Sequence, residues 1–197
     1  MQMLHPFAGS IQQYNEEILD PDRCRPSCCP LCRAKCPLTA HGFYLRTLVD
    51  HGFNGIIRVR RYLCHFCRRT VSLLPEFALP YLRFGVLVVA LFLVARLRDG
   101  TTMAAAACAA GQPGMPYQRG QHWIRRFRQQ ARALTVALVS LTRTVEAGDW
   151  VAKALGMLEE RGWIRAHRFL FAELRMHALG WPRFLVPDGR SRPLRPA

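Results

Sequence analysis

The chain has 197 residues, half of them hydrophobic, and a formal net charge of +15. This hydrophobic fraction excludes wholesale disorder, and the length allows one medium domain or two small ones. The charge comes almost entirely from arginine, because Lys35 and Lys153 are the only lysines. Since arginine binds phosphates and guanine edges through paired hydrogen bonds, the composition favours a polyanionic partner such as nucleic acid.

The first residues show no basic stretch followed by an apolar one, so no export signal is expected. We therefore expect a cytoplasmic, nucleoid-associated protein with reduced cysteines. An apolar run at 84–95 lies between Arg83 and Arg96 and is too short to span a bilayer. It predicts a buried helix and no membrane partner.

Residues 1–22 are expected to be a lead-in segment with a short helix near 12–17. A cysteine-containing module follows at 23–80, with strands at 41–49 and 56–63 around a turn at 50–55. In the second strand Ile57, Val59 and Leu63 alternate with Arg58 and Arg60. The alternation predicts one face that packs and one basic face.

Two Cys-x-x-Cys pairs, Cys29 with Cys32 and Cys64 with Cys67, frame this hairpin. Each pair can present two thiolates to one tetrahedral zinc ion, and four protein ligands leave no position for a catalytic water. We therefore predict one structural Zn²⁺ per chain. The 31 residues between Cys32 and Cys64 require a long loop, which 50–55 can supply.

The first cysteine pair has alternatives. Cys28 adjoins Cys29, and Cys36 is able to replace Cys32 at a wider spacing. His41 and His65 are possible nitrogen ligands, although histidines at strand ends or in such turns usually have other roles. Cys108 lies in an alanine-rich helix and is expected to be a small buried apolar residue.

Residues 81–146 are expected to form a helical domain. Helices are predicted at about 81–97, at 103–110 with a Thr101 or Thr102 cap and Gly111 after its end, and from Pro116 or Tyr117 to about 145. Three helices in this order suggest a helix-turn-helix. Two further helices are expected in 147–180, beginning at an Asp149 cap, and a basic, proline-rich tail in 181–197.

The long third helix has an apolar seam that includes Ile124, Phe127, Leu134, Leu138 and Val145. The seam predicts either the core of a helical bundle or a homodimer through residues 124–145. The other faces of its first half are rich in arginine and lack carboxylates, so an external anion would relieve the repulsion between like charges.

A helix-turn-helix places the first residues of its second helix at base edges, and arginines further along at phosphates. We therefore expect double-stranded DNA as the partner. The candidate base-contacting residues of the helix are Gln118, Arg119, Gln121 and His122. Its candidate phosphate-contacting residues are Arg125, Arg126 and Arg128. The hairpin module adds the basic residues Arg58, Arg60, Arg68 and Arg69.

The order Cys29-Pro30-Leu31-Cys32, His41-Gly42, Cys64-His65-Phe66-Cys67 and Ser72-Leu73-Leu74-Pro75 resembles the DUF6431 family over roughly residues 20–85. That family looks related to the N-terminal zinc ribbons of bacterial insertion-sequence transposases. The segment from Trp123 to Arg128 is similar to the helix-turn-helix that follows such ribbons. The resemblance implies binding to DNA, as at transposon ends, with the four paired cysteines as zinc ligands.

A transposase also needs carboxylates that converge on magnesium, and the few acidic residues after 145 lie among helical segments. We therefore expect an α+β protein, with a zinc ribbon followed by a helical domain, that binds DNA and is not an enzyme. Two alternatives remain open. One is an active or degenerate transposase fragment, and the other is a zinc-ribbon module that docks on a protein or RNA.

Overall fold

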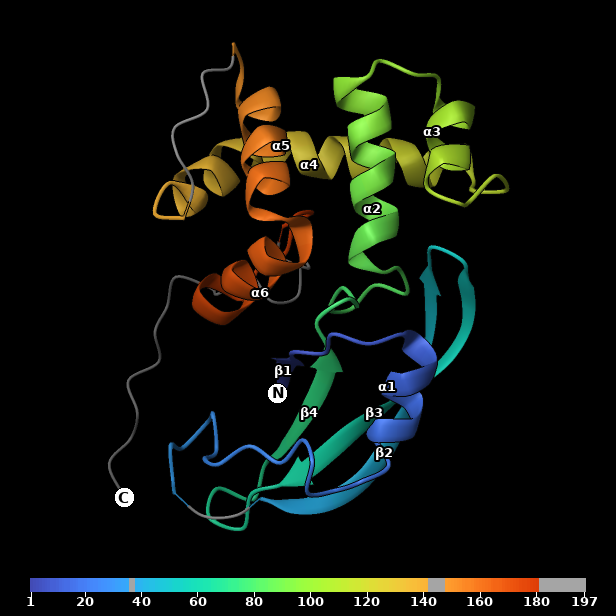
Figure 1. Cartoon of the computed structure of the whole chain (residues 1–197). Coiled ribbons are helices and arrows are strands. Elements are labelled where there is room, and N and C mark those ends of the chain that lie inside the picture. Colours follow the sequence, from blue (N-terminus) through green and yellow to red (C-terminus); the bar gives the residue numbers. More distant parts are fainter. Residues whose placement is uncertain (36–37, 142–147, 181–197) are drawn as a thin grey trace.

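A computed structural model describes residues 1–35, 38–141 and 148–180, and it places a β-sheet at one end of the molecule and a group of helices at the other (Figure 1). The sheet has four strands in the order β1-β4-β3-β2, with β1 parallel to β4 and the other neighbours antiparallel. The mixed α+β composition expected from the sequence is confirmed. The strands are β1 (Gln2–His5), β2 (Thr39–Asp50), β3 (Phe53–Leu63) and β4 (Thr70–Pro75).

The predicted hairpin is present, and its strands are longer than expected. Strands β2 and β3 pair from Asp50 opposite Phe53 to Thr39 opposite Leu63, so only His51 and Gly52 remain in the turn. Gly52 has a φ of +73°, which a glycine adopts without strain. The expected long loop at 50–55 is therefore wrong, because extended strands take up the residues between the two cysteine pairs.

The N-terminal residues belong to the sheet unit and do not form a mere lead-in. Strand β1 adds to β4, and helix α1 (Ile11–Glu17) follows it. The Ser10 hydroxyl accepts from the Gln13 N–H, and the Gln13 side chain accepts from the Ser10 N–H, which fixes the start of α1. Tyr14 and Ile18 are buried in a cluster with residues of β2 and β3.

Arg60 does not lie on an exposed basic face, and that prediction is wrong. Its side chain is 5% exposed, and its guanidinium donates to the backbone oxygens of Ile18 and Leu19. The guanidinium also lies 3.9 Å from the centre of the Phe43 ring. The chain that leaves α1 covers this part of β3, so both faces of the strand are shielded there. Arg58 remains exposed, as predicted.

The helices at the other end are α2 (Val86–Leu93), which continues as the π-helical turn η1 (Val94–Arg98), α3 (Met103–Ala109), α4 (Tyr117–Leu138), α5 (Trp150–Arg161) and α6 (Trp163–Leu174). Most of α2 is buried, and no helix in the described part of the chain is long and apolar enough to cross a membrane. The predicted caps are confirmed, because Thr102 and Asp149 accept from backbone N–H groups and Gly111 has a φ of +68°.

Several helix limits differ from the predictions. Helix α2 begins at Val86 instead of residue 81, because residues 78–85 hydrogen-bond to one another and to the end of β2. Helix α4 ends at Leu138, and the part of its predicted extension at 142–147 lies outside the described residues. Helix α6 ends at Leu174 instead of about residue 179. The predicted tail at 181–197 also lies outside the described residues.

The apolar seam of α4 is buried within this chain. Ile124, Phe127, Leu134 and Leu138 join a core with residues of α2, α5 and α6, and α5 packs along α4. Trp123 makes edge contacts with the rings of Phe84 and Phe92, at centroid distances of 4.9 and 5.4 Å. The bundle-core interpretation therefore holds for the described part of the seam, and a homodimer through residues 124–145 stays a prediction. Val145, which was assigned to the same seam, lies outside the described residues.

Backbone hydrogen bonds join the sheet unit to the helices. The Val49 N–H donates to the Arg83 oxygen at 2.7 Å, and the Gly85 N–H donates to the Val49 oxygen at 2.8 Å. The Arg46 guanidinium donates to the backbone oxygens of Leu79 and Leu82. These contacts fix the start of α2 against the end of β2, so the sheet unit positions the helices.

Candidate metal centre and nucleic-acid interface

The two cysteine pairs have the same backbone geometry. In the first, the Arg33 N–H donates to the Cys29 oxygen at 2.8 Å, and the Cys29 N–H donates to the Ala34 oxygen at 3.1 Å. In the second, the Arg68 N–H donates to the Cys64 oxygen at 2.9 Å, and the Cys64 N–H donates to the Arg69 oxygen at 3.0 Å. Each turn is therefore closed by its own backbone, and we call the two turns the first knuckle and the second knuckle.

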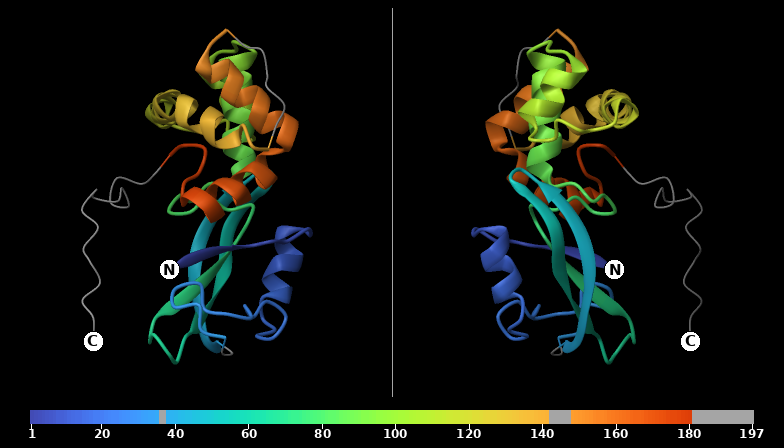
Figure 2. Two further views of the ribbon diagram at one scale, coloured as in Figure 1. Left: turned by 90° about the vertical axis from the view of Figure 1, so that its left-hand side faces the viewer. Right: turned by 90° about the vertical axis from the view of Figure 1, so that its right-hand side faces the viewer.

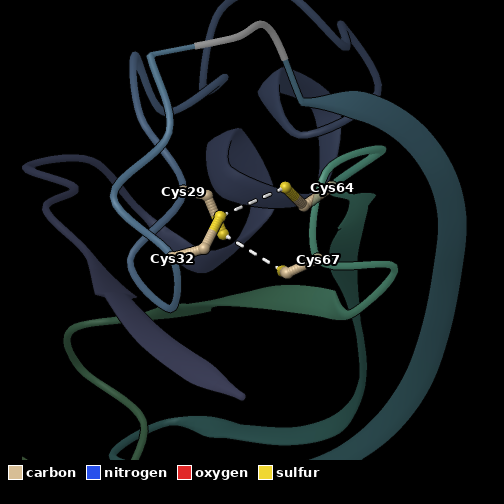
Figure 3. A group of neighbouring side chains, drawn as sticks. All are labelled: Cys29, Cys32, Cys64 and Cys67. Atoms are coloured by element: carbon tan, nitrogen blue, oxygen red, sulfur yellow. Dashed lines mark hydrogen bonds between the residues drawn. The ribbon is translucent and has the colours of Figure 1, made fainter. Parts of the chain in front are cut away.

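The knuckles bring four sulfur atoms together (Figure 3). The Cys29 and Cys67 sulfurs are 3.8 Å apart, those of Cys32 and Cys64 are 3.7 Å apart, and all four lie within 4.8 Å of one another. In a tetrahedron with metal–sulfur bonds of about 2.3 Å, the sulfurs are about 3.8 Å apart. These separations exceed a disulfide bond of about 2.05 Å, and all four thiols are free. The cluster can hold a metal ion.

Backbone groups prepare the second knuckle for a cation. The N–H groups of Cys67 and Phe66 point at the Cys64 sulfur and lower the pKa of Cys64 to about 6. The thiolate of Cys64, which is the form that binds metals, is therefore favoured at neutral pH, whereas the pKa of Cys67 is raised by burial and the neighbouring Cys64 thiol. The Cys29 and Cys64 side chains are buried beside Leu38, Tyr62 and Leu73, which shield one side of the cluster from water.

Among the described residues, Cys29 and Cys32 are the cysteines of the first knuckle that join the cluster. Cys28 is exposed and lies outside the cluster, whereas Cys36 is outside the described residues. His65 Nε2 lies 2.5 Å from the Thr39 hydroxyl, and neither His41 nor His65 belongs to the sulfur cluster. Cys108 is exposed, so its predicted burial is wrong.

The predicted DNA-facing residues of α4 divide into two groups. Gln118, Gln121, His122, Arg125 and Arg128 are exposed. Helix α4 and the turn after it, residues 117–141, contain no aspartate or glutamate. The exposed side of α4 therefore carries positive charge on a segment that has no carboxylate.

Arg119 and Arg126 are only partly exposed, and each has a contact inside the protein. The Arg119 guanidinium lies 5.2 Å from the centre of the Phe84 ring. The Arg126 Nε donates to the Leu179 oxygen at 3.0 Å, which ties the segment after α6 to α4. Both arginines thus have structural contacts that the sequence did not indicate.

The acidic residues near α1 are separated from this basic side. Helix α1 and the residues after it carry Glu16, Glu17, Asp20 and Asp22, and Figure 2 shows α1 and α4 on opposite sides of the molecule. Between residues 23 and 98 the only carboxylates are Asp50 and Glu76, which are 7% and 9% exposed. Other carboxylates lie nearer to α4, because Asp149 caps α5, Glu159 and Glu160 belong to α5, and α5 packs along α4.

Sequence reasoning found Arg68 and Arg69, which are exposed directly after the second knuckle, and missed Arg33 after the first. Arg33 follows Cys32 as Arg68 follows Cys67, and both have left-handed backbones, with φ of 58° and 59°. The repeated pattern Cys-x-x-Cys-Arg was the signal that identifies Arg33 as the counterpart of Arg68.

Comparison with protein families gives a match over part of the chain. Residues 29–109 match a family model described as a domain of unknown function, DUF6431. The match begins at the first ligand-type cysteine and ends at the last residue of α3, so α4 lies beyond it. No curated protein and no solved structure matches the chain. Over residues 29–109 this chain is therefore similar to the DUF6431 family.

Proposed function

We propose that this protein is a zinc-dependent DNA-binding protein that contacts duplex DNA through α4. Zinc is the ion that best fits four thiolates in two Cys-x-x-Cys turns, and a site closed by four protein ligands has a structural role. The hydrophobic cluster beneath the site is small, so metal binding would supply much of the stability of this end of the sheet.

The observation that carries DNA binding is the exposed positive charge of α4, a helix without carboxylates. Arg125 and Arg128 are exposed on a helix without carboxylates, and the exposed acidic residues of α1 lie on the other side of the molecule. Duplex DNA presents a regular array of phosphates, and neutralising it with arginine releases counterions. Helices α2, α3 and α4 would act as a helix-turn-helix, with Gln118, Gln121 and His122 at base edges.

We assign the protein a binding role without catalysis. In the described residues, the four cysteines are the one group of candidate ligands that converges on a common point. Transposon-end binding, which the resemblance to transposase ribbons implies, is a duplex target of the proposed kind. The exposed Arg58 of β3 would extend the phosphate contacts onto the sheet unit.

The test is the salt dependence of duplex binding, measured by fluorescence anisotropy. The combined change Arg125→Ala and Arg128→Ala should weaken binding to all duplexes. It should also reduce the slope of log K against log salt by about 2, because each lost phosphate contact removes about 0.9. Arg165→Ala, at an exposed arginine of α6, is the matched control and should change neither quantity. An unchanged slope in the double variant would refute the assignment of α4.

A further inference from the structure

The two knuckles expose the same kind of side chain at the same position. Leu31 precedes Cys32 and is 37% exposed, and Phe66 precedes Cys67 and is 77% exposed. Large apolar side chains are normally withdrawn from water, yet both knuckles present one at the end of the sheet unit. We call Leu31, Arg33, Phe66 and Arg68 the knuckle tip.

The arginines of the knuckle tip occupy positions where the backbone favours another residue. Arg33 and Arg68 have φ of 58° and 59°, a conformation that costs a non-glycine residue roughly 1–2 kcal/mol. Glycine would close both turns without this cost. Arginine occupies both of these equivalent positions although its backbone conformation there is unfavourable. This indicates that the arginine side chains have a role of their own, apart from closing the turns.

The surroundings of the knuckle tip are basic. Lys35 and Arg69 are also exposed, and they follow the first and second knuckles closely in sequence. No carboxylate occurs in residues 23–49 or 51–75. The exposed Phe66 ring thus lies in a stretch of sequence whose charged side chains are all cationic, which suits a ligand that combines negative charge with a flat apolar surface.

We propose that the knuckle tip binds single-stranded DNA, with an unpaired base stacked on Phe66 and the flanking phosphates held by Arg33 and Arg68. Sites for single strands combine cationic side chains along the backbone with aromatic rings under the bases. A stacked base must expose its face, and in a duplex the faces are covered by neighbouring bases. The ligand is therefore a single strand.

This inference rests on the proposed function for the choice of DNA, and it deepens that function. Helix α4 would hold a duplex while the knuckle tip holds an unpaired strand, so the preferred substrate would contain both. The second knuckle also orients the ring. The Phe66 N–H points at the Cys64 sulfur, and His65 contacts the Thr39 hydroxyl. Phe66 is consequently presented by a rigid turn, which reduces the entropic cost of stacking.

The experiment measures the affinity of the zinc-loaded full chain for a fluorescent thymidine oligonucleotide of about 15 nucleotides and, separately, for a blunt duplex. Phe66→Ala should weaken binding of the single strand by about 5- to 160-fold, and Phe66→Trp should retain it. Duplex affinity should be unchanged in both variants. Leu45→Ala, at a residue of β2 that is 66% exposed, is the control and should bind both ligands normally.

Arg68→Gly separates a binding role from a structural one. Because glycine suits the positive φ, this variant should keep its zinc and melt at the same or a higher temperature, while its affinity for the single strand falls. If Phe66→Ala binds the oligonucleotide as tightly as the wild type, the knuckle-tip proposal is overturned. If the wild type binds the oligonucleotide through Phe66 and ignores the blunt duplex, the knuckle-tip proposal stands and the role of α4 fails.

Discussion

Arg58 and Arg60 lie two residues apart on β3, and the structure gives them opposite roles. The Arg60 guanidinium donates from Nε and Nη2 to the Ile18 oxygen at 3.1 and 2.9 Å, and from Nη2 to the Leu19 oxygen. The Arg58 side chain is exposed. Replacing each arginine with alanine therefore tests whether burial, and not the presence of a charge, decides its effect.

The magnitude for Arg60→Ala follows from these contacts. Each hydrogen bond to a charged group contributes about 1.5–3 kcal/mol, and a shielded cation–π contact such as that with Phe43 about 2 kcal/mol. Removing the buried charge also removes the cost of its desolvation, so the loss of stability is smaller than the sum of these contributions. We expect the free energy of unfolding to fall by about 3–5 kcal/mol. Arg58→Ala should change it by about 0.5 kcal/mol at most.

Urea unfolding followed by circular dichroism measures both variants, and the duplex-binding assay is run on the same preparations. Arg60→Ala should lower the urea midpoint, whereas Arg58→Ala should keep the midpoint and bind duplex more weakly. If Arg60→Ala costs less than about 1 kcal/mol, the side chain does not anchor the segment after α1, and the assignment is refuted.

Three further predictions concern the metal, the junction and acid sensitivity. Cys64→Ser should lose the single zinc ion measured by elemental analysis, together with the chemical-shift dispersion of the sheet unit; a variant that keeps both would contradict a structural zinc. In Gly85→Ala the new Cβ would lie 2.4 Å from Cγ of the buried Asp50, so we expect a loss of about 2 kcal/mol in urea unfolding, whereas Gly114→Ala, with no atom within 4 Å, should be nearly neutral. Burial lowers the pKa of His167 to about 4, so below about pH 6.5 the unfolded chain takes up a proton that the folded chain excludes. The stability associated with neutral His167 is complete above that pH and falls by about 1.4 kcal/mol per unit toward pH 4. His177, whose pKa burial also lowers, adds a slope of the same sign, so His167→Phe should reduce the slope measured by urea unfolding at pH 7 and pH 5 without abolishing it. An equal slope in both proteins would exclude His167 as a source.

The sequence determined the features that depend on local spacing. A gap of two residues lets one turn present two sulfurs, so the two pairs predicted Cys29, Cys32, Cys64 and Cys67 as a set, and the structure brings them together. Helix caps such as Thr102 and Asp149 are equally local, because the capping oxygen lies three residues from its N–H donor. The seam of α4 was predicted from its period, since a 3.6-residue repeat alone defines the buried side of a helix.

Only the tertiary structure decided which charges reach solvent. Alternation along β3 assigned Arg58 and Arg60 to one exposed face, but the pattern of a single strand does not reveal a segment that crosses it from 42 residues away. Strand β1 is short, and its parallel pairing with β4 joins residues about 70 positions apart, as in Gln2 opposite Ser72. Likewise, the pattern of α4 did not determine whether its apolar seam packs against α5 or against α4 of a second copy of the chain, because that depends on packing partners far away in the sequence. Local spacing fixes backbone geometry, whereas burial depends on contacts between segments far apart in the chain.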